Sequence, residues 1–216
     1  MNQQLIRYLY AAIGLINVSS WVFFDGAYNN FTKPLLMPIL MLYLYECFRG
    51  TVVLNTLLIF VALVFSWIGD LALMNTDYFL PGVGSFLIAQ LLYTRLFFGF
   101  KTAWKSWVNW KSALIILYSA GLLWHLLPAA GSLMLPVGLY GMTLLTMSMF
   151  AVNSSPEYKK EYLMGAIGAV FFVLSDSMIA IDKFLTSFDH RNALIMSTYI
   201  LAQYLLVEGL TLKSKA

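Results

Sequence analysis

Charged residues are scarce in this chain, and that scarcity excludes most soluble protein classes. Only 11% of its 216 residues are charged, whereas 61% are hydrophobic. A soluble domain has too little interior to bury so much apolar surface. Aromatic residues reach 16% and include six Trp, which suits segments that end in a membrane interface. We therefore expect a multi-pass membrane protein.

Cysteine and histidine are nearly absent as well. The single Cys47 excludes an internal disulfide, and two His are too few for a metal cage built on several histidines. Neither Gly-x-Ser-x-Gly nor His-Glu-x-x-His occurs. The net charge of +3 comes without a basic stripe, so a nucleic-acid partner is not expected. We expect no metal and no cofactor.

Long apolar runs are what the chain does contain. A helix needs about 20 residues to cross the hydrocarbon core of a membrane. Eight runs reach or approach that length, at about 5–24, 34–48, 52–75, 82–100, 111–128, 133–152, 159–182 and 192–210. The second run is short, and we expect Pro34 in its first turn and a bend at Pro38. The runs predict an all-α integral membrane protein, a bundle of eight transmembrane helices in a single domain over residues 1–216.

The basic residues predict the orientation of the bundle. With the N-terminus in the cytoplasm, three basic residues lie outside (Lys33, Lys183 and Arg191) and nine lie inside (Arg7, Arg49, Lys101, Lys105, Lys111, Lys159, Lys160, Lys213 and Lys215). Both termini are then cytoplasmic. Short loops without targeting signals favour a bacterial inner membrane; the oligomeric state stays open.

Two carboxylates inside apolar runs are the strongest sign of function. Asp70 ends the stretch Phe65-Ser-Trp-Ile-Gly-Asp, and Asp176 ends the similar stretch Phe171-Phe-Val-Leu-Ser-Asp. Ionisable residues within membrane helices usually face the bundle interior or a wet cavity and mark a functional site. In the predicted orientation both aspartates lie in the outer half of the membrane.

A second pair of stretches follows the aspartates. Phe86-Leu-Ile-Ala-Gln90 and Tyr199-Ile-Leu-Ala-Gln203 occupy equivalent runs. The order suggests a duplication with parallel halves at 5–100 and 111–210, although chance matches among common apolar residues are an alternative.

Helical spacing gives the aspartates and their polar neighbours a shared face. The small-residue stripe Gly165, Ala169, Phe172 should turn Asp176 into the bundle. Lys33 enters from the outer end of its run, within reach of an anionic headgroup or of Asp70. We take Asp70 and Asp176 as candidate catalytic groups, and the following polar residues as candidates for substrate binding: Lys33, Gln90, Tyr93, Tyr140, Ser175, Tyr199 and Gln203.

Several strings in this order resemble the YhhN or lysoplasmalogenase family of membrane proteins. They are Lys33-Pro34-Leu35, Phe65-Ser66 with Gly69-Asp70, Gly84-x-Phe86 with Gln90 and Tyr93, Gly165-Ala166 with Phe172 and Ser175-Asp176-Ser177, and Tyr199 with Gln203. The resemblance implies hydrolysis of the vinyl ether bond of lysoplasmalogens, which releases a fatty aldehyde and a glycerophospho-base. The family often has His where this chain has Gln90, and an amide does not shuttle protons as an imidazole does.

The chemistry of a vinyl ether suits a pair of carboxyl groups. Protonation of the β-carbon creates an oxocarbenium ion, to which water adds. A carboxylic acid in apolar surroundings keeps its proton and acts as a general acid. A second carboxylate stabilises the cation, as in glycosidases. We expect Asp70 and Asp176 to share these roles, acting on a lysophospholipid among membrane lipids.

Other functions fit part of the same pattern. Buried carboxylates, mid-membrane polar groups and a tandem repeat are also typical of a proton-coupled transporter. A lipid-binding membrane protein without turnover is a third alternative. Interhelical polar contacts, with no chemistry at all, account for Gln90 and Gln203 about as well as substrate binding does.

Overall fold

The protein is an all-helical bundle of eight long helices, as the apolar runs predicted. The computed structural model describes residues 2–49, 54–99, 110–154 and 159–214, without the side chains of 159–162, 213 and 214. The helices are α1 (Gln3–Phe23), α2 (Asn29–Cys47), α3 (Leu54–Ala72), α4 (Phe79–Phe98), α5 (Trp110–Ala129), α6 (Met134–Val152), α7 (Lys159–Phe184) and α8 (Arg191–Ser214). Short 3-10 turns, η1 (Thr76–Tyr78) and η2 (Gly131–Leu133), precede α4 and α6.

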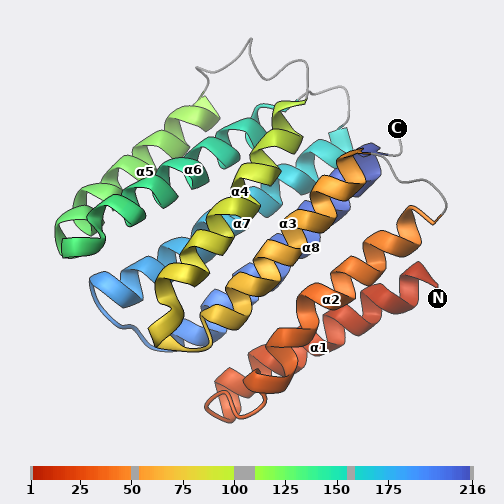
Figure 1. Cartoon of the computed structure of the whole chain (residues 1–216), viewed down its shortest axis with the longest axis horizontal. Helices are drawn as coiled ribbons and strands as arrows, with labels where there is room; N and C mark the ends of the chain where they lie inside the picture. Colours follow the sequence, from red (N-terminus) through yellow and green to blue (C-terminus); the bar gives the residue numbers. More distant parts are fainter. Residues whose placement is uncertain (1, 50–53, 100–109, 155–158, 215–216) are drawn as a thin grey trace.

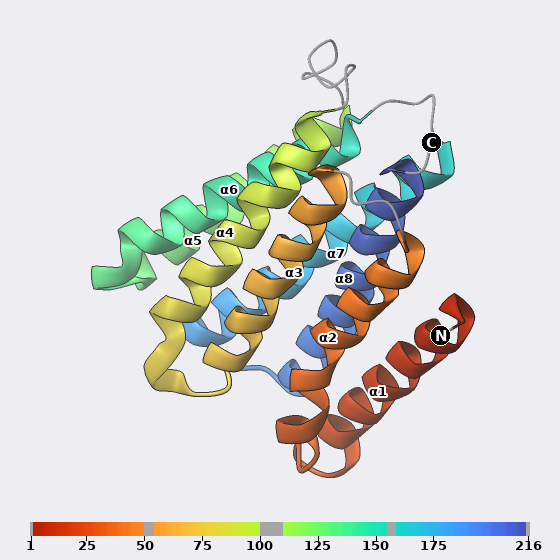
Figure 2. The ribbon, with the colours of Figure 1, turned by 45° about the vertical axis from the view of Figure 1, so that its right-hand side comes forward.

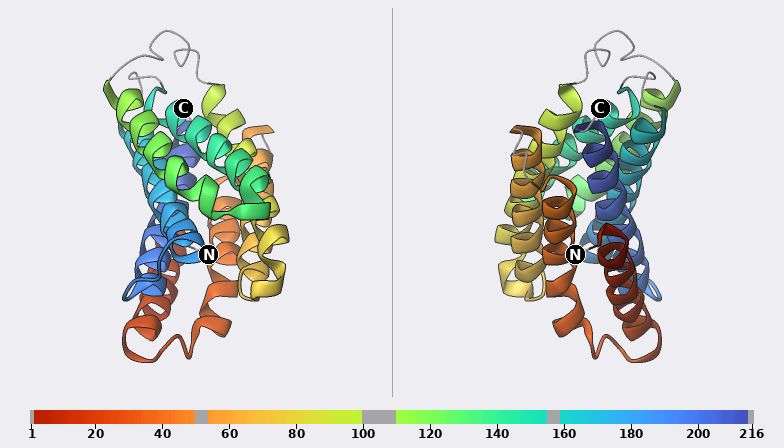
Figure 3. Two further views of the ribbon diagram at one scale, coloured as in Figure 1. Left: turned by 90° about the vertical axis from the view of Figure 1, so that its left-hand side faces the viewer. Right: turned by 90° about the vertical axis from the view of Figure 1, so that its right-hand side faces the viewer.

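The helices are arranged as neighbouring antiparallel pairs. The pair α1–α2 forms one edge of the bundle and the pair α5–α6 the opposite edge, with α3, α4, α7 and α8 between them (Figure 1, Figure 2). Viewed from either side, α2, α3 and α4 lie opposite α7 and α8 (Figure 3). The helix α1 begins and α8 ends at the same end of the bundle. Lys101, Lys105 and Lys215, which entered the prediction of orientation, lie outside the described residues.

The distribution of side chains is that of a protein in lipid. Leu117 and Trp124 expose 72% and 79% of their surface, whereas Gln90 and Gln203 are completely buried. Polar groups inside and apolar groups outside are expected where the surroundings are hydrocarbon. Within the described residues, seven helices are long and apolar enough to cross a membrane, and α2 does not meet that criterion.

The start of α2 was predicted wrongly. The helix begins at Asn29, so Pro34 and Pro38 lie inside it and Pro34 is not in the first turn. Pro38 has no N–H to offer the carbonyl four residues earlier, which is that of Pro34. The indole nitrogen of Trp67 on α3 donates to this carbonyl instead, over 2.9 Å. A side chain from α3 thus compensates for the missing helical bond and joins the two helices close to Lys33.

The backbones of α7 and α8 approach each other closely at Gly168. A Cβ added at Gly168 would lie 2.7 Å from the backbone nitrogen of Leu206 and 3.0 Å from the carbonyl oxygen of Ala202. Only glycine permits so close an approach of two backbones. The predicted stripe also points inward, since Ala169 is fully buried. Backbone contact, however, occurs one residue away from that stripe.

Candidate functional site: two buried carboxylates

Asp70 lies near the end of α3 and is 2% exposed. The hydroxyl of Tyr199 on α8 donates to its Oδ2 over 2.8 Å. The ammonium group of Lys33 on α2 lies 3.9 Å from Oδ1. Three helices therefore converge on one carboxylate, and the lysine supplies the opposite charge that a carboxylate needs in an apolar interior.

The contacts of Asp70 extend inward through Gln203. Its amide nitrogen donates to the hydroxyl of Tyr199 over 3.2 Å and to that of Ser66 over 3.1 Å. Its carbonyl oxygen accepts a 3.0 Å bond from the hydroxyl of Tyr93 on α4. Both polar ends of the Gln203 amide thus have partners, so this network holds the hydroxyl of Tyr199 in position on Asp70.

Asp176 on α7 has its own set of partners. The hydroxyl of Tyr140 on α6 and the amide nitrogen of Gln90 on α4 both donate to Oδ2, the latter over 3.3 Å. The hydroxyl of Thr143, one turn beyond Tyr140, donates to the carbonyl oxygen of Gln90 over 2.7 Å and orients that amide. Among the described residues, neither a hydrogen bond to Oδ1 nor a Lys or Arg ion pair with this carboxyl group is found.

An aromatic cluster connects the two carboxylates. The rings of Phe86, Phe172 and Tyr199 pack edge to face, with centroids 5.9 to 6.3 Å apart. Tyr199 contacts Asp70 through its hydroxyl, and Phe86 borders a cavity together with Asp176.

Gly69, next to Asp70, makes room for this cluster. A Cβ at that position would come within 2.6 Å of the ring of Phe86. Any other residue would displace the ring or the helix end that carries the aspartate.

Asp176 borders two small cavities. It lines one small cavity of about 60 Å³ with Phe86 and Tyr140, and a second cavity of about 50 Å³ with Tyr140 and residues of α5. A carboxyl group at the edge of a cavity is available to a ligand. No group of three or more His, Cys, Asp or Glu in the described part of the chain is placed to hold a metal ion.

Most of the candidate residues predicted from the sequence gather around the two aspartates. Lys33, Tyr199, Gln203 and Tyr93 belong to the network of Asp70, and Gln90 and Tyr140 contact Asp176. Ser175 does not join them: its hydroxyl donates to the backbone carbonyl of Ile195 over 3.2 Å. Adjacent residues of a helix point in different directions, which explains why a neighbour of Asp176 faces α8.

Thr143 was not among the candidate site residues predicted from the sequence. Its signal was the spacing of three residues from Tyr140, which places both side chains on one face of α6.

Fold and site together define a multi-pass helical membrane protein with paired carboxylates buried in its interior. A family model described as the YhhN family matches residues 28–210. The chain belongs to the YhhN family, which confirms the resemblance inferred from its motifs.

Relatives of known name agree with that membership. Over 182 residues the chain is 32% identical to lysoplasmalogenase TMEM86A of Bos taurus, covering 79% of this chain and 73% of the relative. It is 32% identical to TMEM86A of Homo sapiens over 181 residues, which are 78% of this chain and 73% of the relative. It is 34% identical to human lysoplasmalogenase TMEM86B over 149 residues, which are 67% of this chain and 59% of the relative. No solved structure matches the chain significantly.

Proposed function

We propose that this protein is a membrane-embedded lysoplasmalogenase. It hydrolyses the vinyl ether bond of a lysoplasmalogen to a fatty aldehyde and glycerophosphocholine or glycerophosphoethanolamine. Relatives named lysoplasmalogenase support the substrate class. One observation carries the assignment of the site: the carboxyl group of Asp176 is buried, borders a cavity and receives both of its hydrogen bonds on Oδ2.

Asp176 is the proposed proton donor. With Tyr140 and Gln90 both on Oδ2, Oδ1 is the oxygen that carries the proton toward the cavity. The O–H bond of Asp176 breaks as its proton is added to the β-carbon of the vinyl ether. The double bond is consumed, and an oxocarbenium ion remains.

Water completes the reaction. The oxygen of a water molecule bonds to the oxocarbenium carbon while the Asp176 carboxylate takes one proton from that water. The product is a hemiacetal. The carbon–oxygen bond to glycerol then breaks, with one proton moving from the hemiacetal hydroxyl to the leaving oxygen. One vinyl ether and one water thus yield one aldehyde and one alcohol, and Asp176 is protonated again.

Asp70 supplies the negative charge in this proposal. Lys33 at 3.9 Å favours an ionised Asp70, whereas Asp176 has no such partner among the described residues. A fixed anion near a developing cation lowers the energy of the transition state. The division of labour resembles that of two glycosidase carboxylates with different environments.

The proposed orientation has both termini in the cytoplasm of a bacterium and the protein in the inner membrane. The start of α1 and the end of α8 lie at one end of the bundle, and the excess of basic residues favours that end as the inner one. Asp70 and Asp176 then lie toward the outer leaflet. Alkaline phosphatase fused after Ser214 should be inactive in cells, and an active fusion would reverse the orientation.

Aldehyde release by the purified protein tests the function. Asp176→Asn should lower the rate at least a hundredfold, since general acid catalysis contributes about 10²–10⁴-fold. Asp70→Asn should also lower it at least a hundredfold, since loss of one electrostatic stabiliser costs about 10²–10³-fold. Asp182→Asn is the matched control on the same helix, because Asp182 pairs with Arg191 over 3.1 Å, outside the site. Full activity in Asp176→Asn, or no aldehyde from the wild type, contradicts the proposal. A proton-coupled carrier would instead show ion-dependent flux in liposomes without aldehyde.

A further inference from the structure

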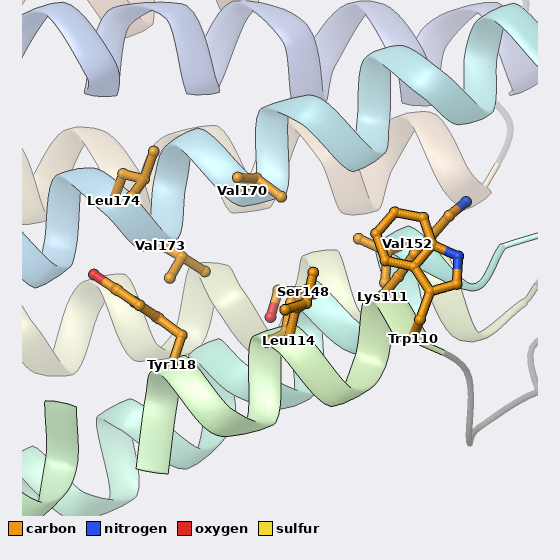
Figure 4. Close-up of a pocket in the computed structure, with 10 residues that line it drawn as sticks. Trp110, Lys111, Leu114, Tyr118, Ser148, Val152, Val170, Val173 and Leu174 are labelled. Atoms are coloured by element: carbon orange, nitrogen blue, oxygen red, sulfur yellow. The ribbon is translucent and has the colours of Figure 1, made fainter. Parts of the chain in front are cut away.

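An apolar groove lies between α5 and α7, one turn or more along α7 from Asp176. Its volume is about 360 Å³. Leu114 and Tyr118 on α5 form one wall, Val170 and Val173 on α7 form the other, and Ser148 lies at its base on α6 (Figure 4). We call this space the α5–α7 groove.

The α5–α7 groove adjoins one of the two cavities at Asp176. Tyr118 and Val173, at one end of it, also border the cavity that Asp176 shares with Tyr140. That cavity in turn shares Tyr140 and Ala180 with the one bordered by Phe86. Three adjoining spaces are thus lined by α7, with the groove at one end and Asp176 between the other two.

The packing of α5 accounts for the opening. Ser112 and Leu126 are the buried residues that the structure describes on this helix. Near its outer end α5 lies close against α6, since a Cβ at Gly141 would be 2.8 Å from Leu123. Along the rest of the groove, Val170 and Ser148 are too short to fill the space toward α5.

The length of the groove suits one lipid chain. Ser119 borders the cavity of Asp176, and Trp110 lies at the far end of the groove. The nine residue steps from Trp110 to Ser119 span about 14 Å at 1.5 Å per step. One leaflet of a membrane contributes about 15 Å of hydrocarbon. A chain that starts at Asp176 therefore reaches about the end of the groove.

A cation lies beside the aromatic wall at the other end of the series of spaces. Beyond Asp176, Phe79 and Phe184 line the cavity. The ammonium group of Lys183 lies 4.4 Å from the centre of the Phe79 ring. A phosphate group at this end would be near a cation, and the chain would point the opposite way, into the apolar groove.

We propose that the α5–α7 groove binds the alkenyl chain of the substrate, with the vinyl ether at Asp176 and the headgroup toward Lys183. The proposal rests on the proposed function and adds the position and direction of the lipid. The groove then limits the length of chain that the enzyme accepts. A short chain occupies only the part next to Asp176, and a long chain needs the full groove.

Groove-filling substitutions test this. Val170 lies six residues, about 9 Å, along α7 from Asp176, so Val170→Phe blocks the groove beyond the first part of the chain. We expect kcat/KM for a hexadecenyl lysoplasmalogen to fall at least tenfold and that for an octenyl analogue to stay within twofold. Leu114→Trp, from the opposite wall, should act in the same way.

Val22→Phe is the matched control for these variants. Val22 on α1 is exposed to a similar extent as Val170, at 43% and 39%, and lies on the far edge of the bundle. It should leave both substrates unchanged. Equal losses for long and short chains in Val170→Phe and Leu114→Trp, or no loss in either, would overturn the proposal.

Labelling separates the groove from the hydrolysis. A non-cleavable alkyl-ether lysophospholipid with a diazirine at the end of its chain should label residues within Trp110–Tyr118 or Val170–Leu174, whether or not the protein releases aldehyde. Competition by long-chain but not short-chain lysolipid is expected. Labelling confined to other helices would refute the groove even if the enzyme is active, and labelling of the groove would support it even if hydrolysis fails.

Discussion

The hydroxyl of Tyr199 donates a 2.8 Å hydrogen bond to the carboxylate of Asp70, joining α8 to α3 across the centre of the bundle. The ring of the same tyrosine packs against Phe86 and Phe172, beside the Asp176 cavity. One side chain thus contacts one carboxylate and supports the wall of the space used by the other. The contributions of the Tyr199 hydroxyl and of its ring can be separated by mutation.

Tyr199→Phe removes the hydroxyl and keeps the ring. Asp70 then loses its donor, and we expect kcat for aldehyde release to fall about tenfold with little change in KM, because a charge-assisted hydrogen bond contributes about 1.5–3 kcal/mol. Tyr204→Phe, on the same helix, should have no such effect, since Tyr204 stacks on Tyr10 away from Asp70. Equal effects of the two variants would refute a specific role for Tyr199.

Thr143→Val tests the orientation of Gln90. Without the 2.7 Å bond from Thr143, the amide of Gln90 is free to turn away from Asp176. We expect kcat to fall severalfold at an unchanged melting temperature. Thr146→Val provides the comparison, because the Thr146 hydroxyl bonds only to its own helix, at Met142. A loss in Thr146→Val as large as in Thr143→Val would contradict the assignment.

The rate should depend on pH in the direction that a proton donor requires. Protonated Asp176 is the active form in the proposed mechanism, so the initial rate should fall about tenfold per pH unit once the pH exceeds the value at which this group gives up its proton. The purified protein, checked for folding by circular dichroism at each pH, provides the profile. A rate that is constant or rises over the same range would exclude Asp176 as the donor.

Trp67→Phe should destabilise the bundle. The carbonyl of Pro34 loses its donor, because Pro38 has no N–H to replace the indole. An unsatisfied acceptor costs about 1–3 kcal/mol when fully buried, and this part-buried carbonyl should cost about 1 kcal/mol. A lower midpoint of thermal or denaturant unfolding would report the loss. Trp124→Phe, at a position 79% exposed, should leave the midpoint unchanged. A larger drop in the unfolding midpoint for Trp124→Phe than for Trp67→Phe would refute the role of the Trp67 hydrogen bond.

Gly168→Ala should destabilise the α7–α8 contact. The added methyl group would meet the backbone of Leu206 at 2.7 Å, so the two helices must separate. Gly84→Ala is the control within a helix, because nothing lies within 4 Å of its Cβ position. We expect a clearly lower melting temperature for the first variant only. A similar loss in both would point to helix propensity and not to packing.

The hypothesis of two related halves, 5–100 and 111–210, stays a prediction. Asp70, in the first half, accepts from Tyr199 in the second, and Asp176, in the second half, accepts from Gln90 in the first. Such a crossed pattern is what a repeat about a central axis predicts.

The path of α2 could not be predicted from the sequence. Two prolines in one run suggested a late start and a bend, because a helix interior normally needs every N–H. The helix instead continues through Pro34 and Pro38, with the indole of Trp67 in place of one missing donor. The compensating group lies on another helix, and local rules do not reveal it.

Composition and periodicity by themselves determined the class of protein, the eight helices and the burial of Asp70 and Asp176. These follow from hydropathy and from the cost of a charge in lipid, which act residue by residue. The tertiary structure decided the pairing: Tyr199 and Lys33 with Asp70, Tyr140 and Gln90 with Asp176. Such contacts depend on how helices far apart in the chain pack together. The same packing decided that two matching aspartates have different surroundings, one with a cation and one at the edge of a cavity.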